Sequence, residues 1–489
     1  MALTIDTARA QLAAVGQEHL LQFADSLDEA SLAALLSQIG TIDFSLLAAL
    51  QRGEGLVADV SPDAAITPTP VVRRSDNEQE WLAAEAAGEA ALRDGRLAAF
   101  VVAGGQGTRL GFDGPKGTYP VLPETKGTLF QIFAEKLLFA ARKYGKTVPL
   151  YVMTSAMNHA ATEAFWKEHG YFGLDAADVS FFSQAFMPAV DPNGKVMLAD
   201  KGSIAMSPNG HGGSLAALVD SGAVADMRKR GIEYISYFQV DNPLVQIVDP
   251  AFLGFHIRAG SEMSSKVLPK AAPLEKVGNF CRVDDKLAVV EYSDMPEALA
   301  RQSVEQDATG AFKSIGDDAS PAEVAKLRFN AGNIAIHAIN VDFVNRMGGG
   351  EGRAVSLPFH KANKKIPTVD ASGAAVTPDA PNGVKYEMFV FDAVTFAKNS
   401  ICVETVRCDD FGPVKNADGV DSPASSRALL DDQARRWLRA AGVADADLPA
   451  VIEISPTCGT TEADFVAFFT AAKPAVSKDA PLVLRNDKK

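Results

Sequence analysis

The sequence is poor in cysteine and in histidine. Its 489 residues include only four cysteines and seven histidines. The cysteines, Cys281, Cys402, Cys408 and Cys458, form no CxxC pair, and the histidines form no HxH or HExxH pair. Cysteines this sparse argue against a disulfide framework, and the missing spacings argue against a zinc site. We therefore expect reduced thiols in a cytoplasmic protein.

Long hydrophobic runs and an excess of positive charge are also missing. No run reaches the roughly 18 uncharged apolar residues of a membrane span. The first residues carry acidic side chains where a signal peptide would be basic. The formal net charge is -14, which disfavours general binding to nucleic acids or to anionic membranes. We expect small-molecule partners, and any anionic ligand must meet a local basic cluster.

The first part of the chain has the spacing of helices. Residues 5–53 and 75–95 show helical periodicity, with capping boxes predicted at Ser26 with Glu29 and at Ser75 with Glu78. The Pro- and Thr-containing stretch between them, residues 61–75, is interpreted as a connection. The residues up to 96 are therefore predicted to be a helical region that supports the rest of the chain.

From residue 97 the pattern changes to short apolar runs that alternate with longer helical segments. Strands are predicted at 97–105, 148–155, 179–184 and 232–242. Their βαβαβ order predicts an α/β fold around a mixed, mostly parallel sheet, in which ligands bind at the carboxyl ends of the strands. Further on we predict a hairpin through 279–292, a strand pair at 385–394 and 400–408, and a small C-terminal domain. The predicted divisions are 1–96, 97–424 and 425–489.

One loop, FVVAGGQGTRLGFDGPKGTYPVLP from Phe100 to Pro123, combines glycines with cations. Four glycines fall within eight residues after a predicted strand, so backbone N–H groups can approach an anion without obstruction by Cβ atoms. The spacing fits neither GxxxxGK[ST] nor GxGxxG. Arg109 and Lys116 add two cations. The loop alone is compatible with a phosphate site or with a solvated turn.

A carboxylate follows another predicted strand. Asp241 lies in the apolar surroundings of YFQVDNPLV, at the end of the run 232–242. A buried carboxylate needs either hydrogen-bond donors or a metal. Beside a polyphosphate, Mg²⁺ becomes the favoured partner, because it typically takes one or two carboxylates together with phosphate oxygens.

A series of motifs in this order resembles the eukaryotic-type UDP-sugar pyrophosphorylases, most closely their UDP-N-acetylhexosamine members. The motifs are AGGQGTRLG, PKG, SPNGHGG, VDNP, NAGNIA, KYEMFVFD and FGPVKNAD, and the resemblance covers residues 98–427. It implies a GT-A-like nucleotidyltransferase core, with an N-terminal helical region and a small C-terminal domain.

The resemblance also implies roles for individual residues. For the uridine nucleotide these are Ala103, Gly104, Gly105, Gln184, Gly210 and Gly212. For the triphosphate they are Arg109 and Lys116, and for Mg²⁺ Asp241. For the sugar and its phosphate they are Glu291, Tyr292, Asn333, Lys385 and Lys415. His211 and Ile336 stand where asparagine is expected, and the roles of Lys364 and Lys365 are open.

The reaction implied is transfer of a uridylyl group. UTP and a sugar 1-phosphate, in the first place N-acetylglucosamine 1-phosphate, would give UDP-sugar and pyrophosphate. One alternative is glucose 1-phosphate or another hexose 1-phosphate, because His211 and Ile336 depart from the N-acetylhexosamine pattern. The other is a nucleotide-sugar binding protein without turnover. The preferred sugar and the oligomeric state stay open.

Overall fold

The computed structural model describes residues 3–57, 65–350 and 357–486. It separates into two compact units, each discontinuous in sequence. The smaller unit comprises Met1–Ser61, Gln184–Leu215 and Val355–Asp392, and the larger unit comprises the remaining segments. The sequence-based divisions at residues 96 and 424 stay predictions, and the two units are described separately.

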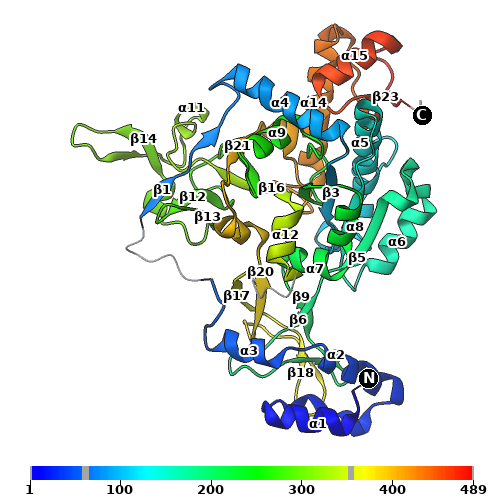
Figure 1. Ribbon diagram of the computed structural model, residues 1–489, viewed down its shortest axis with the longest axis vertical. Helices are drawn as coiled ribbons and strands as arrows, with labels where there is room; N and C mark the ends of the chain where they lie inside the picture. Colours follow the sequence, from blue (N-terminus) through cyan, green and yellow to red (C-terminus); the bar gives the residue numbers. More distant parts are fainter. Residues whose placement is uncertain (1–2, 58–64, 351–356, 487–489) are drawn as a thin grey trace. The chain divides into compact units, whose positions relative to one another are not determined.

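A single mixed sheet organises the larger unit (Figure 1). Its main path runs β2-β21-β11-β16-β10-β3-β4-β5. These strands are β2 (Val71–Val72), β3 (Leu97–Val102), β4 (Leu150–Thr154), β5 (Val179–Ser183), β10 (Tyr234–Gln239), β11 (Met263–Leu268), β16 (Gly332–Asn340) and β21 (Cys402–Glu404). Only β16 runs antiparallel to its neighbours on this path, β10 and β11. The α/β class and the mostly parallel sheet are therefore confirmed.

Three further strands extend the sheet from β16, namely β1 (Ile66–Pro68), β12 (Asn279–Val283) and β13 (Lys286–Val290). β12 and β13 form the predicted hairpin, whose turn residues Asp284 and Asp285 have positive φ angles of 48° and 63°. The interpretation of 61–75 as a connection missed β1 and β2, because strands of two or three residues with adjacent prolines carry no periodicity. Residues 61–64 lie outside the described residues.

Most helices of the larger unit lie between these strands in the order of the chain. They are α4 (Glu78–Arg93), α5 (Leu129–Tyr144), α6 (His159–Glu168), α7 (Ser214–Asp220), α8 (Ala223–Lys229), α9 (Pro250–Arg258) and α12 (Val341–Met347). An excursion after β13 adds α10 (Glu297–Ala300), β14 (Gln302–Gln306), β15 (Phe312–Ser314) and α11 (Pro321–Val324). Leu97, Ala99 and Val101 of β3 share one core cluster with Phe130 and Phe133 of α5, so the strand alternates its side chains between two covered faces.

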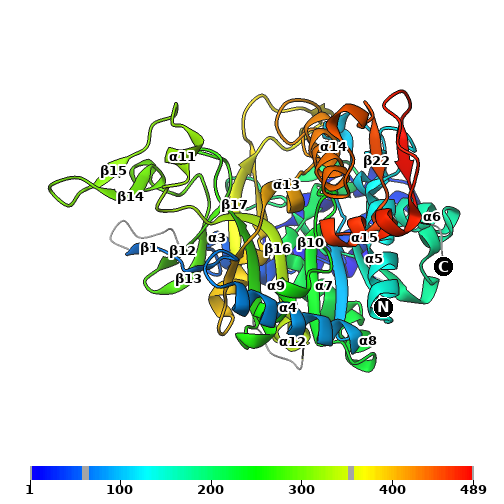
Figure 2. The same cartoon turned by 90° about the horizontal axis from the view of Figure 1, so that it is seen from above.

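Two glycines allow the helices α4 and α9 to pack closely (Figure 2). A Cβ atom on Gly88 would lie 1.8 Å from the carbonyl oxygen of Pro250, and one on Gly254 would lie 1.6 Å from that of Ala84. Both distances are far inside van der Waals contact, so only glycine permits this approach.

The two predicted capping boxes are wrong. The side chain of Asn77 caps α4 by accepting from the N–H of Glu80, and the side chain of Asp28 caps α2 (Glu29–Gly40) by accepting from the N–H of Ser31. In each case the helix begins later than the pattern suggested, and an Asx side chain at the observed N-cap accepts from the N–H three residues further on.

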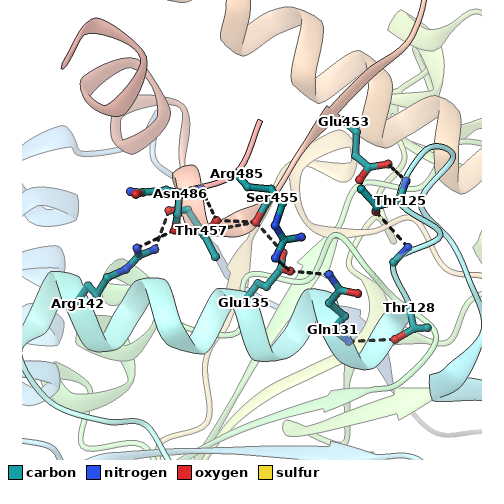
Figure 3. A network of polar contacts seen from close by, with 11 residues as sticks. Thr125, Thr128, Gln131, Glu135, Arg142, Glu453, Ser455, Thr457, Arg485 and Asn486 are labelled. Atoms are coloured by element: carbon teal, nitrogen blue, oxygen red, sulfur yellow. Dashed lines mark hydrogen bonds and ion pairs between the residues drawn. The ribbon is translucent and has the colours of Figure 1, made fainter. Parts of the chain in front are cut away.

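The last part of the chain packs on α5. It contains α13 (Arg407–Asp410), α14 (Pro423–Ala440), β22 (Ile452–Ile454), α15 (Glu462–Ala472) and β23 (Leu482–Leu484), and β22 pairs in parallel with β23. Figure 3 shows the polar network at this junction. The buried carboxylate of Glu135 accepts hydrogen bonds from Arg485 and Ser455, each at 2.7 Å. Glu453 accepts from the backbone of Glu124 and Thr125.

The smaller unit combines the N-terminal helices with paired short strands. Its helices are α1 (Ile5–Ala14), α2 and α3 (Phe44–Gln51), and its strand pairs are β6 (Phe186–Pro188) with β9 (Met206–Pro208), β7 (Leu198–Asp200) with β8 (Ser203–Ile204), β17 (Phe359–Lys364) with β20 (Gly383–Met388), and β18 (Thr368–Val369) with β19 (Ala375–Val376). The predicted pairing of 385–394 with 400–408 is thus wrong, because β20 pairs with β17 and β21 with β11 and β2.

Hydrogen bonds attach the N-terminal helical segment to the strands of this unit. The side chain of Gln17 donates to the carbonyl of Gly194 and accepts from the N–H of Val196, and His19 contacts the carbonyl of Val196 at 2.7 Å. Within the described residues no single helix meets the length and hydropathy of a membrane span. Only α2 and α3 taken together, with a 58° bend between them, do so by length and composition.

Candidate functional site

Polar segments gather at the carboxyl ends of the parallel strands β3, β4 and β10. The glycine loop follows β3, Ser155 and Asn158 follow β4, and Asp241 follows β10. Because these strands are parallel neighbours in the sheet, the segments leave it at the same edge. This edge is the candidate site of the larger unit.

The start of the glycine loop is fixed by an asparagine that no sequence motif singles out. The buried side chain of Asn158 donates to the carbonyls of Ala103, at 2.9 Å, and of Gly105, at 3.2 Å. Its own carbonyl accepts from the N–H of Ser155 at 2.8 Å. The only signal in the sequence was a polar residue soon after a predicted strand. Asn158 orients the backbone of the loop and leaves its outer face open.

The glycine loop folds back on itself and exposes Arg109. The N–H of Gly107 donates to the carbonyl of Gly114 at 2.9 Å, and the N–H of Lys116 donates to that of Gly105 at 3.1 Å. A Cβ atom on Gly105 would meet no atom within 4 Å, so packing does not require glycine there, whereas a ligand against the backbone would. Arg109 is exposed and makes no hydrogen bond or ion pair with the residues that the structure describes.

Lys116 and Asp241 form an ion pair across the site. The ammonium group of Lys116 lies 3.3 Å from a carboxylate oxygen of Asp241, and their side chains are 15% and 12% exposed. A cation and an anion are thus held side by side and remain in contact with solvent. The pairing joins the loop after β3 to the segment after β10, which the sequence could not show.

Lys415 belongs to the segment that lies against Asp241. The N–H of Val414 donates to the backbone carbonyl of Asp241 at 2.8 Å. The ammonium of Lys415 lies 5.4 Å from the ring centre of Phe411 and 3.7 Å from the carboxylate of Asp421, with a side chain that is 40% exposed. The structure therefore brings the segments of Asp241 and Lys415 together.

Asn333 and Glu291 lie on either side of Gly278. Asn333 is near the start of β16, which is antiparallel to β10, so it lies at the same sheet edge as Asp241. Its N–H donates to the carbonyl of Gly278 at 2.8 Å, and a Cβ atom on Gly278 would lie 2.8 Å from a carboxylate oxygen of Glu291. The neighbouring Tyr292 is 50% exposed. Asn333 and Glu291 are thus both close to Gly278.

Ile336 belongs to the hydrophobic core. Its side chain is 2% exposed and packs in the cluster that contains the α5 face. The isoleucine that stands in place of the expected asparagine therefore belongs to the core, and the side chain of Ile336 does not line an open surface.

The remaining predicted residues belong to the smaller unit. Gln184 is buried directly after β5, Lys385 is partly buried on β20, and Lys364 and Lys365 are exposed. Gly210 has a φ of 84°, and Cβ atoms on Gly210 and Gly212 would lie 2.3 and 2.7 Å from backbone atoms of Met388. These glycines thus permit close packing against β20 within the unit.

His211 is a packing residue in the smaller unit. Its ring stacks on Phe389 with 5.2 Å between the ring centres, and its Nδ1 accepts from the N–H of Val390 at 3.2 Å. Burial, and secondarily the neighbouring His360, lowers the pKa of His211 to about 4. The imidazole is therefore neutral near pH 7 and supplies no charge to a phosphate.

Residues 64–433 match the family model of UTP–glucose-1-phosphate uridylyltransferase. The chain belongs to this family. Whole protein sequences are similar to this chain as well. The chain is 37% identical over 494 aligned residues to human UDP-N-acetylhexosamine pyrophosphorylase-like protein 1, covering 92% of this chain and 91% of the relative.

Two more relatives support this placement in the UTP–glucose-1-phosphate uridylyltransferase family. UDP-N-acetylglucosamine pyrophosphorylase of Saccharomyces cerevisiae is 35% identical, with 81% of this chain and 80% of the relative covered. The structure of the Trypanosoma brucei uridine diphosphate N-acetylglucosamine pyrophosphorylase superimposes with a TM-score of 0.74 at 30% identity, covering 99% of this chain and 98% of the other. The family resemblance and the fold predicted from sequence are confirmed.

Proposed function

We propose that the protein is a uridylyltransferase that converts UTP and N-acetylglucosamine 1-phosphate into UDP-N-acetylglucosamine and pyrophosphate. The observation that carries the proposal is the similarity of 81% of the chain to UDP-N-acetylglucosamine pyrophosphorylase of Saccharomyces cerevisiae, at 35% identity, together with that of 92% of the chain to human UDP-N-acetylhexosamine pyrophosphorylase-like protein 1, at 37% identity. The paired Lys116 and Asp241 at the sheet edge provide chemistry suited to this reaction. A cytoplasmic location remains part of the proposal.

The reaction needs alignment and charge stabilisation more than proton transfer. A phosphate oxygen of the sugar 1-phosphate attacks the α-phosphorus of UTP, forming one P–O bond. The bond from the α-phosphorus to the oxygen bridging to the β-phosphorus breaks, and pyrophosphate leaves with that electron pair. The nucleophile is already an anion at neutral pH, so no general base is required. The protein must hold two anions in line and meet the negative charge that develops.

The residues of the larger unit supply those functions. Arg109 is exposed and without a described partner, so it is available for the β- and γ-phosphates. Lys116 would turn from Asp241 toward the phosphates when the nucleotide binds. Lys415 is assigned to the sugar phosphate or the α-phosphate, and Asn333 and Glu291 to the sugar. The backbone from Ala103 to Gly105 would lie against the nucleotide.

Mg²⁺ is proposed as the metal, with Asp241 as its protein ligand. Within the described part of the chain, no three His, Cys, Asp or Glu side chains are grouped to hold an ion. A single accessible carboxylate nevertheless fits Mg²⁺, because this ion keeps waters and takes phosphate oxygens as its other ligands. When bound, it would neutralise part of the phosphate charge. Asp241 is paired with Lys116 in this structure, which holds the carboxylate at the sheet edge.

The reverse reaction tests the proposal and separates the alternatives. The protein is incubated with Mg²⁺, pyrophosphate and one UDP-sugar at a time, and UTP release is measured. Faster release from UDP-N-acetylglucosamine than from UDP-glucose supports the proposal. The opposite preference would make glucose 1-phosphate the substrate, and no release from any donor would indicate a nucleotide-sugar binding protein.

A further inference from the structure

A buried carboxylate, Asp410, lies behind the proposed site. It is 0% exposed and ends α13. One of its oxygens accepts from the N–H of Gln246 at 2.7 Å. The other contacts the ammonium of Lys266 and accepts from the hydroxyl of Thr405 at 2.9 Å. Asp410 thus reaches the segment that carries Asp241.

Hydrogen bonds between residues 241–246 and residues 410–414 continue from Asp410 to the site itself. The side chain of Asn242, 4% exposed, donates to the carbonyl of Asp410 at 2.7 Å and accepts from the N–H of Gly412 at 3.0 Å. Two residues further, Val414 donates to the carbonyl of Asp241. The segment 241–246 is therefore joined at several points to the segment 410–414. The first segment contains Asp241, which is assigned to Mg²⁺, and the second adjoins Lys415, which is assigned to phosphate.

Two buried lysines anchor this junction to the rest of the larger unit. Lys136 of α5 donates to the carbonyls of Pro243 and Val245, each at 2.7 Å. Lys266, in the middle of β11 and 2% exposed, pairs with Asp410 and, at 2.7 Å, with Asp249 at the start of α9. Burying two lysine side chains costs free energy unless the amino group of each is fully hydrogen-bonded or paired. If packing were their only role, apolar side chains of similar volume would fill the same space at a lower desolvation cost.

We propose that Asp410 and Asn242, anchored through Lys266 and Lys136, form a positioning device that sets Asp241 and Lys415 relative to each other for uridylyl transfer. This inference rests on the proposed function of those two residues. None of the four touches a substrate in the proposed mechanism; they act through the backbone that carries Asp241 and Lys415. Such positioning matters because a displacement of about 1 Å can reduce a rate roughly 100-fold.

The test uses full-length Asp410→Asn and Asn242→Ala variants. Asp410→Asn keeps the shape of the side chain but removes the charge opposite Lys266. Asn242→Ala leaves every buried charge in place, so it remains informative if the first variant does not fold. We expect each to lower kcat about 10- to 100-fold while KM and the calorimetric Kd for UTP change less than about threefold, because misalignment weakens the transition state more than ground-state binding.

Hydrogen exchange supplies a readout that does not depend on turnover. Each variant should speed amide exchange in both segments, 241–246 and 410–414, although each carries its substitution in only one of them. Faster exchange confined to the substituted segment would overturn the proposal. So would a kcat that falls only in proportion to the loss of folded protein.

Glu262→Gln is the matched control. Glu262 makes a bidentate ion pair with Arg346, at 2.7 Å for each contact, but it precedes β11 and so lies at the sheet edge opposite Asp241. This variant should lose stability without changing kcat or exchange in the two segments. If the unsubstituted protein shows no turnover with any sugar, the proposed function fails, and the exchange experiment still decides whether the two segments are coupled.

Discussion

Replacing Lys116 by alanine tests the charge arrangement of the site most directly. The change removes the ammonium 3.3 Å from Asp241 and leaves the fold of the loop intact, because the backbone N–H of Lys116 still donates to Gly105. Loss of one preorganised electrostatic donor typically costs about 100- to 1000-fold in kcat, or roughly 2.7 to 4 kcal/mol of transition-state stabilisation. We expect a loss of that size at saturating UTP and sugar 1-phosphate.

The same substitution should also affect how Asp241 binds Mg²⁺, and this effect does not weaken the enzyme as the loss of kcat does. At 3.3 Å and an effective dielectric constant near 20, the pair attracts by about 5 kcal/mol before desolvation is subtracted, and the net value is much smaller. Removing the cation leaves the carboxylate freer to bind Mg²⁺. The Mg²⁺ concentration for half-maximal rate should therefore stay equal or fall in Lys116→Ala, while kcat falls.

Steady-state kinetics with a control lysine make the experiment decisive. Lys313 pairs with Glu305 at 3.2 Å on the exposed β14–β15 hairpin, and Lys313→Ala should keep kcat within about twofold. Thermal unfolding of both variants checks that the fold is retained. A kcat within about threefold of the unsubstituted protein for Lys116→Ala would refute the assignment of this residue to the triphosphate.

Three further predictions concern stability. Burial lowers the pKa of Lys136 to about 7, so between pH 7 and 10.5 the unfolded chain binds a proton that the folded chain lacks. The free energy of unfolding should therefore rise with pH by up to about 1.4 kcal/mol per pH unit. Urea titrations of Lys136→Met at several pH values should lack this rise. Glu135→Gln should destabilise the protein by about 1.5 to 3 kcal/mol in urea unfolding, since it weakens a charge-assisted bond from Arg485; an unchanged midpoint would contradict the network of Figure 3. Gly254→Ala should lower the melting temperature, although alanine normally favours a helix by about 1 kcal/mol, because its Cβ would overlap the carbonyl of Ala84; a rise would show that α4 can shift.

Much of the fold could be predicted because strands and helices leave periodic signals in the sequence. The four apolar runs from 97 to 242 became β3, β4, β5 and β10, and the hairpin at 279–292 became β12 and β13. Local competition could not be predicted in the same way. Asn77 rather than Ser75 caps α4, because several polar residues near a helix start can take the N-cap position.

The candidate site was predicted in part. Residue type and position after a strand were enough to select Asp241, Arg109 and Lys116 as candidates. Asn158 and Asp410 were missed, because each acts through backbone groups that are distant in the sequence. Asn158 is 55 residues from its partner Ala103, and Asp410 is 164 residues from its partner Gln246.

The sequence by itself determined the longer strands and helices and the polar residues that follow them, because hydrophobic periodicity and backbone conformation are local properties. It also determined the family, because the motifs are short and ordered along the chain. Only the tertiary structure decided that Lys116 meets Asp241 and that His211 packs as a neutral ring. It alone placed Ile336 in the core and two lysines behind the site. These contacts depend on which distant segments the sheet brings together, and that choice is made by the packing of the whole chain.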